Sequence, residues 1–142
     1  MLLIDVSEHN GTINWEAVKA AGVQGAIIRC GYGMDIASQD DKQWSRNVAE
    51  CERLGIPYGV YLYSYADNAD KARSEAQHVL RLINGHKLSY PVYYDLEQAG
   101  IEGAAVANAI IFGDVIEAAG YWCGVYYNKD WHNRVIKGRL DR

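Results

Sequence analysis

Two carboxylates end one apolar stretch of the sequence. Residues 90–97 read Tyr-Pro-Val-Tyr-Tyr-Asp-Leu-Glu, which predicts a short buried strand that ends in Asp95 and Glu97. Because side chains on a strand alternate faces, we expect both acids on one face, with their backbones roughly 6.5 Å apart. Two acids on one face are costly unless a site uses them. An acid with a raised pKa protonates a leaving oxygen while an ionised neighbour stabilises positive charge, which is the arrangement that glycoside hydrolysis needs.

A third acid, Asp5, ends the first apolar run and is expected to point into the same cleft. Three neighbouring carboxylates cannot all ionise without cost, so at least one pKa should rise. Two other interpretations stay open. The acids could cap helices or form salt bridges, or they could bind a hard metal ion such as magnesium.

Tyrosines line one face of a further predicted strand. Within residues 58–65, Tyr61, Tyr63 and Tyr65 alternate with Val60 and Leu62. We expect Tyr61 to pack in an aromatic core and Tyr65, at the strand end, to be the better ligand candidate. Two histidines complete the candidates: His9 follows the first strand and is a candidate for the cleft, whereas His78 is expected at the surface or in packing.

Strands and helices alternate along the chain. Strands are predicted at 2–6, 25–30, 58–65, 91–96 and 121–127, helices at about 15–21, 42–54, 69–83 and 103–119, and a short helical turn near Trp131. Units of roughly thirty residues predict a parallel sheet with right-handed crossovers. An open doubly wound sheet and the first part of a β/α barrel both fit, and both place active sites at the carboxyl ends of strands. The residues expected at such ends are Asp5, Arg29, Tyr65, Asp95 and Glu97.

Composition narrows the class of protein. A chain of 142 residues is long enough for one domain with a substantial core. The net charge of -4 and the lack of a basic stripe argue against a nucleic-acid partner. The three cysteines show no CxxC spacing, so no disulfide framework is expected. We expect no signal peptide and no membrane partner, because no basic leader and no apolar run near 18 residues occur.

Several segments together resemble one known family. They are residues 4–11 (Ile-Asp-Val-Ser-Glu-His-Asn-Gly), 14–22 (Asn-Trp-Glu-Ala-Val-Lys-Ala-Ala-Gly), 27–33 (Ile-Ile-Arg-Cys-Gly-Tyr-Gly), 55–65 (Gly-Ile-Pro-Tyr-Gly-Val-Tyr-Leu-Tyr-Ser-Tyr) and 91–97 (Pro-Val-Tyr-Tyr-Asp-Leu-Glu). In this order they resemble glycoside hydrolase family 25, the Chalaropsis-type lysozymes or N-acetylmuramidases.

The resemblance implies an irregular β/α barrel that cleaves the β-1,4 bond between N-acetylmuramic acid and N-acetylglucosamine in peptidoglycan. It maps the general acid onto Glu97, the acid that supports the reacting centre onto Asp95, and the first-strand active-site acid onto Asp5. Its implied sugar-contacting or cleft-lining positions are Tyr32, Tyr63, Tyr65 and Tyr126. No metal or organic cofactor is implied. The partner is the glycan strand of the cell wall, which the protein would reach outside the cell or after release by a phage.

Members of this family usually continue for several more tens of residues, which supply the last barrel strands and a further active-site acid. We therefore expect residues 1–142 to form a single catalytic domain of this type, an incomplete barrel of about five parallel strands. An open sheet exposes its edge strands, so three interpretations stay open: a truncated fragment or split gene product, completion of the sheet by self-association or strand exchange, or a barrel whose remaining part another chain supplies. The alternative function is a catalytically impaired module of the same fold that binds the wall or assists assembly.

Overall fold

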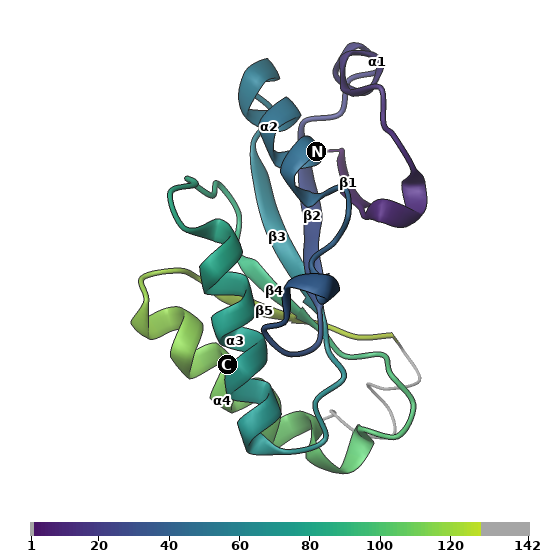
Figure 1. Cartoon of the computed structure of the whole chain (residues 1–142). Coiled ribbons are helices and arrows are strands. Elements are labelled where there is room, and N and C mark those ends of the chain that lie inside the picture. Colours follow the sequence, from purple (N-terminus) through teal and green to yellow (C-terminus); the bar gives the residue numbers. More distant parts are fainter. Residues whose placement is uncertain (1, 129–142) are drawn as a thin grey trace.

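The computed structural model describes residues 2–128, and the turn expected near Trp131 lies outside them. One parallel sheet has the order β1-β2-β3-β4-β5, formed by β1 (Leu3–Val6), β2 (Gly25–Tyr32), β3 (Tyr58–Tyr63), β4 (Val92–Asp95) and β5 (Cys123–Tyr126). The helices α1 (Trp15–Ala20), α2 (Trp44–Leu54), α3 (Ala69–Ile83) and α4 (Ala105–Ala118) alternate with the strands (Figure 1). The predicted α/β alternation is confirmed, and the sheet is open.

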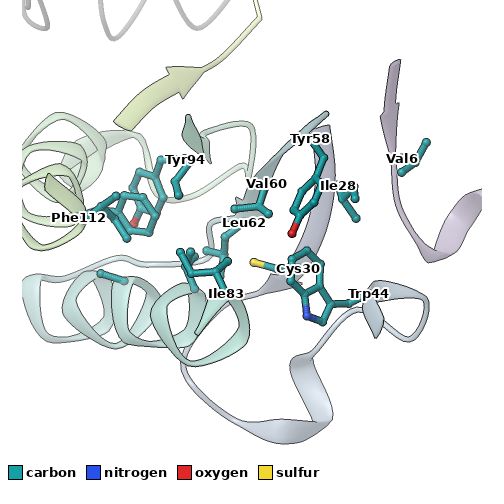
Figure 2. Packing of buried hydrophobic residues seen from close by; sticks show 14 of the residues in the cluster. Val6, Ile28, Cys30, Trp44, Tyr58, Val60, Leu62, Ile83, Tyr94 and Phe112 are labelled. Atoms are coloured by element: carbon teal, nitrogen blue, oxygen red, sulfur yellow. The ribbon is translucent and has the colours of Figure 1, made fainter. Parts of the chain in front are cut away.

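The core lies between the sheet and its helices, among which α3 and α4 lie side by side (Figure 1). Alternate residues of the central strands, such as Val60 and Leu62, are fully buried on this side. Figure 2 shows Tyr94 of β4 against Phe112 of α4, and their rings stack with centroids 4.0 Å apart. Burying each large apolar side chain contributes about 1.5–3 kcal/mol, so this layer fixes which face of each strand is left for the site.

Local sequence explains where the helices begin and end. Asn14 and Asn68 are the N-caps of α1 and α3, because their side-chain oxygens accept from the Ala17 and Lys71 amides at 3.1 and 2.9 Å. Gly55 ends α2 in the left-handed conformation, with φ of 68°. The start of α4 differs from the prediction at 103, because Glu102–Ala104 form a 3₁₀ turn first.

The strand ends also differ from the predicted ranges. Strand β3 stops at Tyr63 rather than at 65, because the Ser64 hydroxyl and the Tyr65 amide bond to the side chain of Glu75. Strand β2 continues past 30 to Tyr32, and a register shift between Arg29 and Gly31 accommodates this extension. Strands β1, β4 and β5 are each shorter than predicted, spanning four residues.

Within residues 2–128, no helix is long and apolar enough to cross a membrane. Among the described residues, Cys30, Cys51 and Cys123 form no disulfide bond. In the described sheet β1 pairs only with β2 and β5 only with β4, so each outer strand has one hydrogen-bonded neighbour.

Candidate active site

A cavity of about 360 Å³ opens on the face of the sheet opposite the helix-packed core. It brings the three predicted acids together, although they come from distant parts of the sequence. Its lining residues are Asp5, Ile27, Tyr61, Tyr93, Asp95, Glu97 and Tyr126. The expectation that the carboxyl ends of the strands meet at one cleft is thus met for Asp5, Asp95 and Glu97.

Strand register explains the convergence. Asp95 is the register partner of Tyr63 on β3 and of Tyr126 on β5, so these three side chains emerge at one level. The pairing continues past the end of β4, because the Leu96 amide donates to the Tyr126 carbonyl at 2.8 Å. Leu96 is fully buried, and the extended backbone therefore returns Glu97 to the face that Asp95 occupies.

Asp95 and Glu97 form an interacting pair of carboxyl groups. Their side chains are hydrogen-bonded to each other, and two carboxyls can do this only when one carries a proton. Burial, the bond to Glu97, and the negative charges of Glu97 and Asp5 raise the pKa of Asp95 to about 9. Asp95 and Glu97 share this proton, because two strongly interacting groups titrate as a pair. The pair therefore retains one proton at neutral pH.

The two members of the pair differ in access. Asp95 is only 6% exposed, whereas Glu97 is partly exposed. Asp95 Oδ1 is buried and has no hydrogen-bond partner among the described residues. A buried acceptor without a donor is costly, so this oxygen is suited to an N–H or O–H of a ligand in the cavity.

Arg29 lies beside the site without lining the cavity. Its guanidinium donates to Asp41 at 2.7 Å and to Glu8 at 3.0 Å, and its carbon centre lies 5.4 Å from the Tyr32 ring centroid. Arg29 was expected among the residues that converge at the strand ends. Its charge instead forms ion pairs with Asp41 and Glu8. The positive charge of Arg29 makes only a minor contribution to the pKa of Asp95, which it lowers.

The tyrosines divide between two hollows. Tyr126 lines the acid cavity and is half-exposed, whereas Tyr32 and Tyr65 line a neighbouring hollow of about 420 Å³. Tyr63 connects the two, because its register partner is Asp95 and its ring centroid lies 5.2 Å from that of Tyr65. The Tyr63 hydroxyl donates to Gln98 at 3.1 Å, and the Tyr65 ring meets the Tyr32 ring edge-on at 6.0 Å.

Tyr61 was expected in a packed aromatic core, and that expectation is wrong. Tyr61 lines the acid cavity, where burial is the main cause that raises its pKa, and Asp5 and Asp95 add to it. Strand alternation places Tyr61 on the same face as Tyr63, which was the available signal. The same alternation places Tyr93 beside Asp95, and Tyr93 and Ile27 are lining residues that the sequence reasoning missed.

The histidine expectations have different outcomes. His9 is exposed in a short 3₁₀ turn, Glu8–Asn10, and is not among the lining residues. His78 is fully buried in α3, as a packing residue: its ring nitrogens lie 2.9 Å from the Gly33 carbonyl oxygen and 2.7 Å from Asp40 Oδ1. Within residues 2–128, no group of three His, Cys, Asp or Glu side chains is arranged to hold a metal ion.

The fold and the site together define an α/β domain with a carboxyl pair at the ends of parallel strands. Comparison with protein families then gives the particular family: the chain belongs to the glycosyl hydrolases family 25, whose model matches residues 4–141. It is a family of glycoside hydrolases, as the sequence resemblance implied.

Individual relatives agree with this membership. Lysozyme M1 of Streptomyces globisporus is 33% identical over 75 residues, which cover 53% of this chain and 24% of the relative. The modular autolysin LytC of Streptococcus pneumoniae is 36% identical, with a TM-score of 0.81 over 92% of this chain and 33% of LytC. A family 25 glycosyl hydrolase from Bacillus anthracis has the same fold, with a TM-score of 0.80 at 18% identity, over 96% of this chain and 64% of that one. This chain thus spans about a quarter of lysozyme M1 and a third of LytC.

Proposed function

We propose that the protein hydrolyses the β-1,4 bond between N-acetylmuramic acid and N-acetylglucosamine in bacterial peptidoglycan. The observation that carries the proposal is the hydrogen-bonded pair of Asp95 and Glu97 in a cavity that Asp5 also lines. The relatives support the substrate class, since one is a lysozyme by name and LytC has been solved in complex with a synthetic peptidoglycan ligand. The protein would act on the cell wall.

Glu97 is the proposed general acid. It is the more exposed member of the pair, so it is the one that can reach the glycosidic oxygen of a bound strand. The proton that the pair retains at neutral pH would pass from Glu97 to the leaving oxygen as the bond breaks. Proton donation balances the electron pair that leaves with this oxygen, and positive charge develops on the sugar ring.

Asp95 is proposed to hold the acetamido group of the reacting sugar. Its unpartnered Oδ1 would accept the acetamido N–H, which would direct the acetamido oxygen at the anomeric carbon. The hydrogen bond between the two carboxyls makes them closer than the roughly 6.5–9.5 Å that an inverting enzyme needs for a water between them. This proximity does not fit the inverting geometry and is compatible with the substrate-assisted course. The acetamido oxygen would bond to the anomeric carbon as the glycosidic bond breaks, and a water molecule would then attack this carbon, break the new bond and return a proton to the carboxyl pair.

Asp5 and the tyrosines are proposed to complete the site. The negative charge of Asp5, which already raises the pKa of Asp95, would stabilise the positive charge on the sugar. Tyr126 lies in the acid cavity, and the ring cluster of Tyr32, Tyr63 and Tyr65 extends from it. Tyrosine rings offer an apolar face and a hydroxyl, which suits stacking and hydrogen bonding to sugars along the glycan strand.

A turbidity assay on bacterial walls tests the proposal. The wild-type protein should clear the suspension, and Glu97→Gln should slow clearing by about 100-fold or more, because the amide has no proton to deliver. Glu16→Gln is the matched control, since the Glu16 side chain is 70% exposed and pairs with Arg53 away from the cavity. Equal clearing by wild type and Glu97→Gln would contradict the role of Glu97. Wall binding without clearing by the wild type would instead support a binding module.

A further inference from the structure

A buried carboxylate lies behind the sheet, on the face opposite the acid cavity. Glu75, in α3, is fully buried and accepts three hydrogen bonds. Its Oε1 accepts from the Ser64 hydroxyl at 2.8 Å and from the Tyr94 hydroxyl at 2.5 Å, and its Oε2 accepts from the Tyr65 amide at 2.8 Å. A carboxylate is the side chain that accepts three donors at once without donating.

Two of the three donors, Tyr94 and Ser64, are adjacent in sequence to residues of the proposed site, and the third, Tyr65, belongs to it. Tyr94 precedes Asp95, and their side chains leave opposite faces of β4, so anchoring Tyr94 fixes the direction in which Asp95 points. The Ser64 amide donates to the Asp95 carbonyl at 3.0 Å, which ties the end of β3 to the same residue. The hydrogen bond from the Tyr65 amide to Glu75 positions the backbone of Tyr65, whose ring contacts those of Tyr32 and Tyr63.

Tyr94 and Glu75 are themselves held firmly by the helices behind the sheet. The Tyr94 ring stacks on Phe112 with an interplanar angle of 15°, and Glu75 itself belongs to a helix of 15 residues. Two carboxyls that share a proton are sensitive to their separation, because both the hydrogen bond and the charge repulsion between them change steeply with distance. A shift of β4 against β3 would therefore be felt at the pair of Asp95 and Glu97.

We infer that Glu75 is a positioning residue for the proposed glycosidase site, holding Asp95 through Tyr94 and Ser64 and holding Tyr65 through its backbone. The inference rests on the proposed function for its catalytic meaning. Its physical content, the placement of Asp95, is measurable without turnover.

The test is an NMR titration of the side-chain carboxyl resonances of Asp95 and Glu97. Four samples are compared with the wild type: Glu75→Gln, Tyr94→Phe, Ser64→Ala and the control Asn47→Ala. Asn47 is a buried polar residue of α2 that accepts from Trp15 Nε1 at 3.0 Å, so it matches the loss of a buried bond away from the site. Near-ultraviolet circular dichroism establishes that each variant is folded.

Glu75→Gln, Tyr94→Phe and Ser64→Ala should each lower the titration midpoint of Asp95 by about one pH unit, since a less constrained Asp95 gains water and separates from Glu97. Asn47→Ala should leave the midpoint unchanged. A fall in Glu75→Gln alone would overturn the inference, because removing the charge of Glu75 would then explain it. Unchanged midpoints in all variants would also overturn it.

Turnover distinguishes this inference from the proposed function. If the wild type clears walls, the three variants should lose about 10-fold in kcat, since small displacements of reacting groups are costly, and Asn47→Ala should not. If the wild type clears no walls, the proposed function fails, and the titration still decides whether Glu75 positions Asp95.

Discussion

The side chain of Asp95 is hydrogen-bonded to that of Glu97, although strand β4 ends at Asp95 and Glu97 lies two residues beyond it. The burial of Leu96 between them keeps the backbone extended and returns both carboxyls to one face. The pair therefore retains one proton, shared between Asp95, which is 6% exposed, and Glu97, which is partly exposed.

The first prediction concerns the pH dependence of stability. The pKa of Asp95 is raised to about 9 in the folded protein, whereas in the unfolded chain it is about 3.9. Between these values the folded state binds more protons than the unfolded state, so the contribution of Asp95 to the free energy of unfolding falls as pH rises. Asp95→Asn removes this dependence, and its stability relative to wild type should grow between pH 5 and pH 8 by up to about 1 kcal/mol per pH unit.

Urea unfolding at these pH values measures the difference. Asp70→Asn is the control, because the Asp70 side chain is 96% exposed and should give a constant offset from wild type. A difference between Asp95→Asn and wild type that is constant with pH would contradict the retained proton.

The second prediction concerns the ion cluster beside the site. The Asp41 side chain is fully buried, and it accepts from Arg29 at 2.7 Å and from the Glu8 and Gln43 amides at 3.0 and 2.9 Å. Asp41→Ala leaves the buried guanidinium with a weaker partner, so the free energy of unfolding should fall by about 3–5 kcal/mol. Chemical denaturation measures it.

Asp70→Ala serves as the comparison, because the pair of Asp70 with Arg73 is solvent-exposed and should change stability by about 1 kcal/mol or less. An equal decrease in the free energy of unfolding in Asp41→Ala and Asp70→Ala would show that the buried cluster around Arg29 stabilises the protein no more than an exposed ion pair does.

The meeting of the three acids could be predicted from the sequence, whereas the contacts that support them could not. Strand alternation and strand order placed Asp5, Asp95 and Glu97 in one cleft, because parallel strands present their carboxyl ends at one edge. The end of β3 was missed, because it depends on Glu75, which lies in the following helix and whose bonds to Ser64 and Tyr65 leave no local pattern. The paired partners of Arg29 were missed for the same reason: Glu8 and Asp41 are far from it in sequence.

Tyr61 was assigned to the core because tyrosine most often packs there. The alternation that buries Val60 and Leu62 against the helices leaves Tyr61 on the other face, and the acids on the neighbouring strands turn that face into a cavity. Strand alternation predicts which face of the sheet each residue occupies. Only the three-dimensional arrangement of the five strands shows which other side chains lie on that face.

The third prediction concerns the tyrosine cluster next to the acid cavity. The Tyr65 side chain is 47% exposed and touches the rings of Tyr32 and Tyr63 edge-on or tilted, as a surface for sugars should. Tyr65→Ala should raise KM for a defined glycan fragment by roughly three- to tenfold with little change in kcat, since one aromatic contact is worth about 0.5–1.5 kcal/mol.

Steady-state kinetics on that fragment measures the effect. Trp122→Ala is the control, because Trp122 is 81% exposed and precedes β5, at the end of the sheet opposite to the acids. An equal rise of KM in both variants would mean that the cluster of Tyr32, Tyr63 and Tyr65 is not a sugar-binding surface.

The most direct measurement is the identity of the new reducing end. Purified peptidoglycan is digested with the wild-type protein, the products are reduced with borohydride, and mass spectrometry identifies the terminal sugar alcohol. We expect N-acetylmuramitol ends with the wild type and at least about 100-fold fewer with Glu97→Gln. N-acetylglucosaminitol ends, or equal numbers of muramitol ends with wild type and Glu97→Gln, would contradict it.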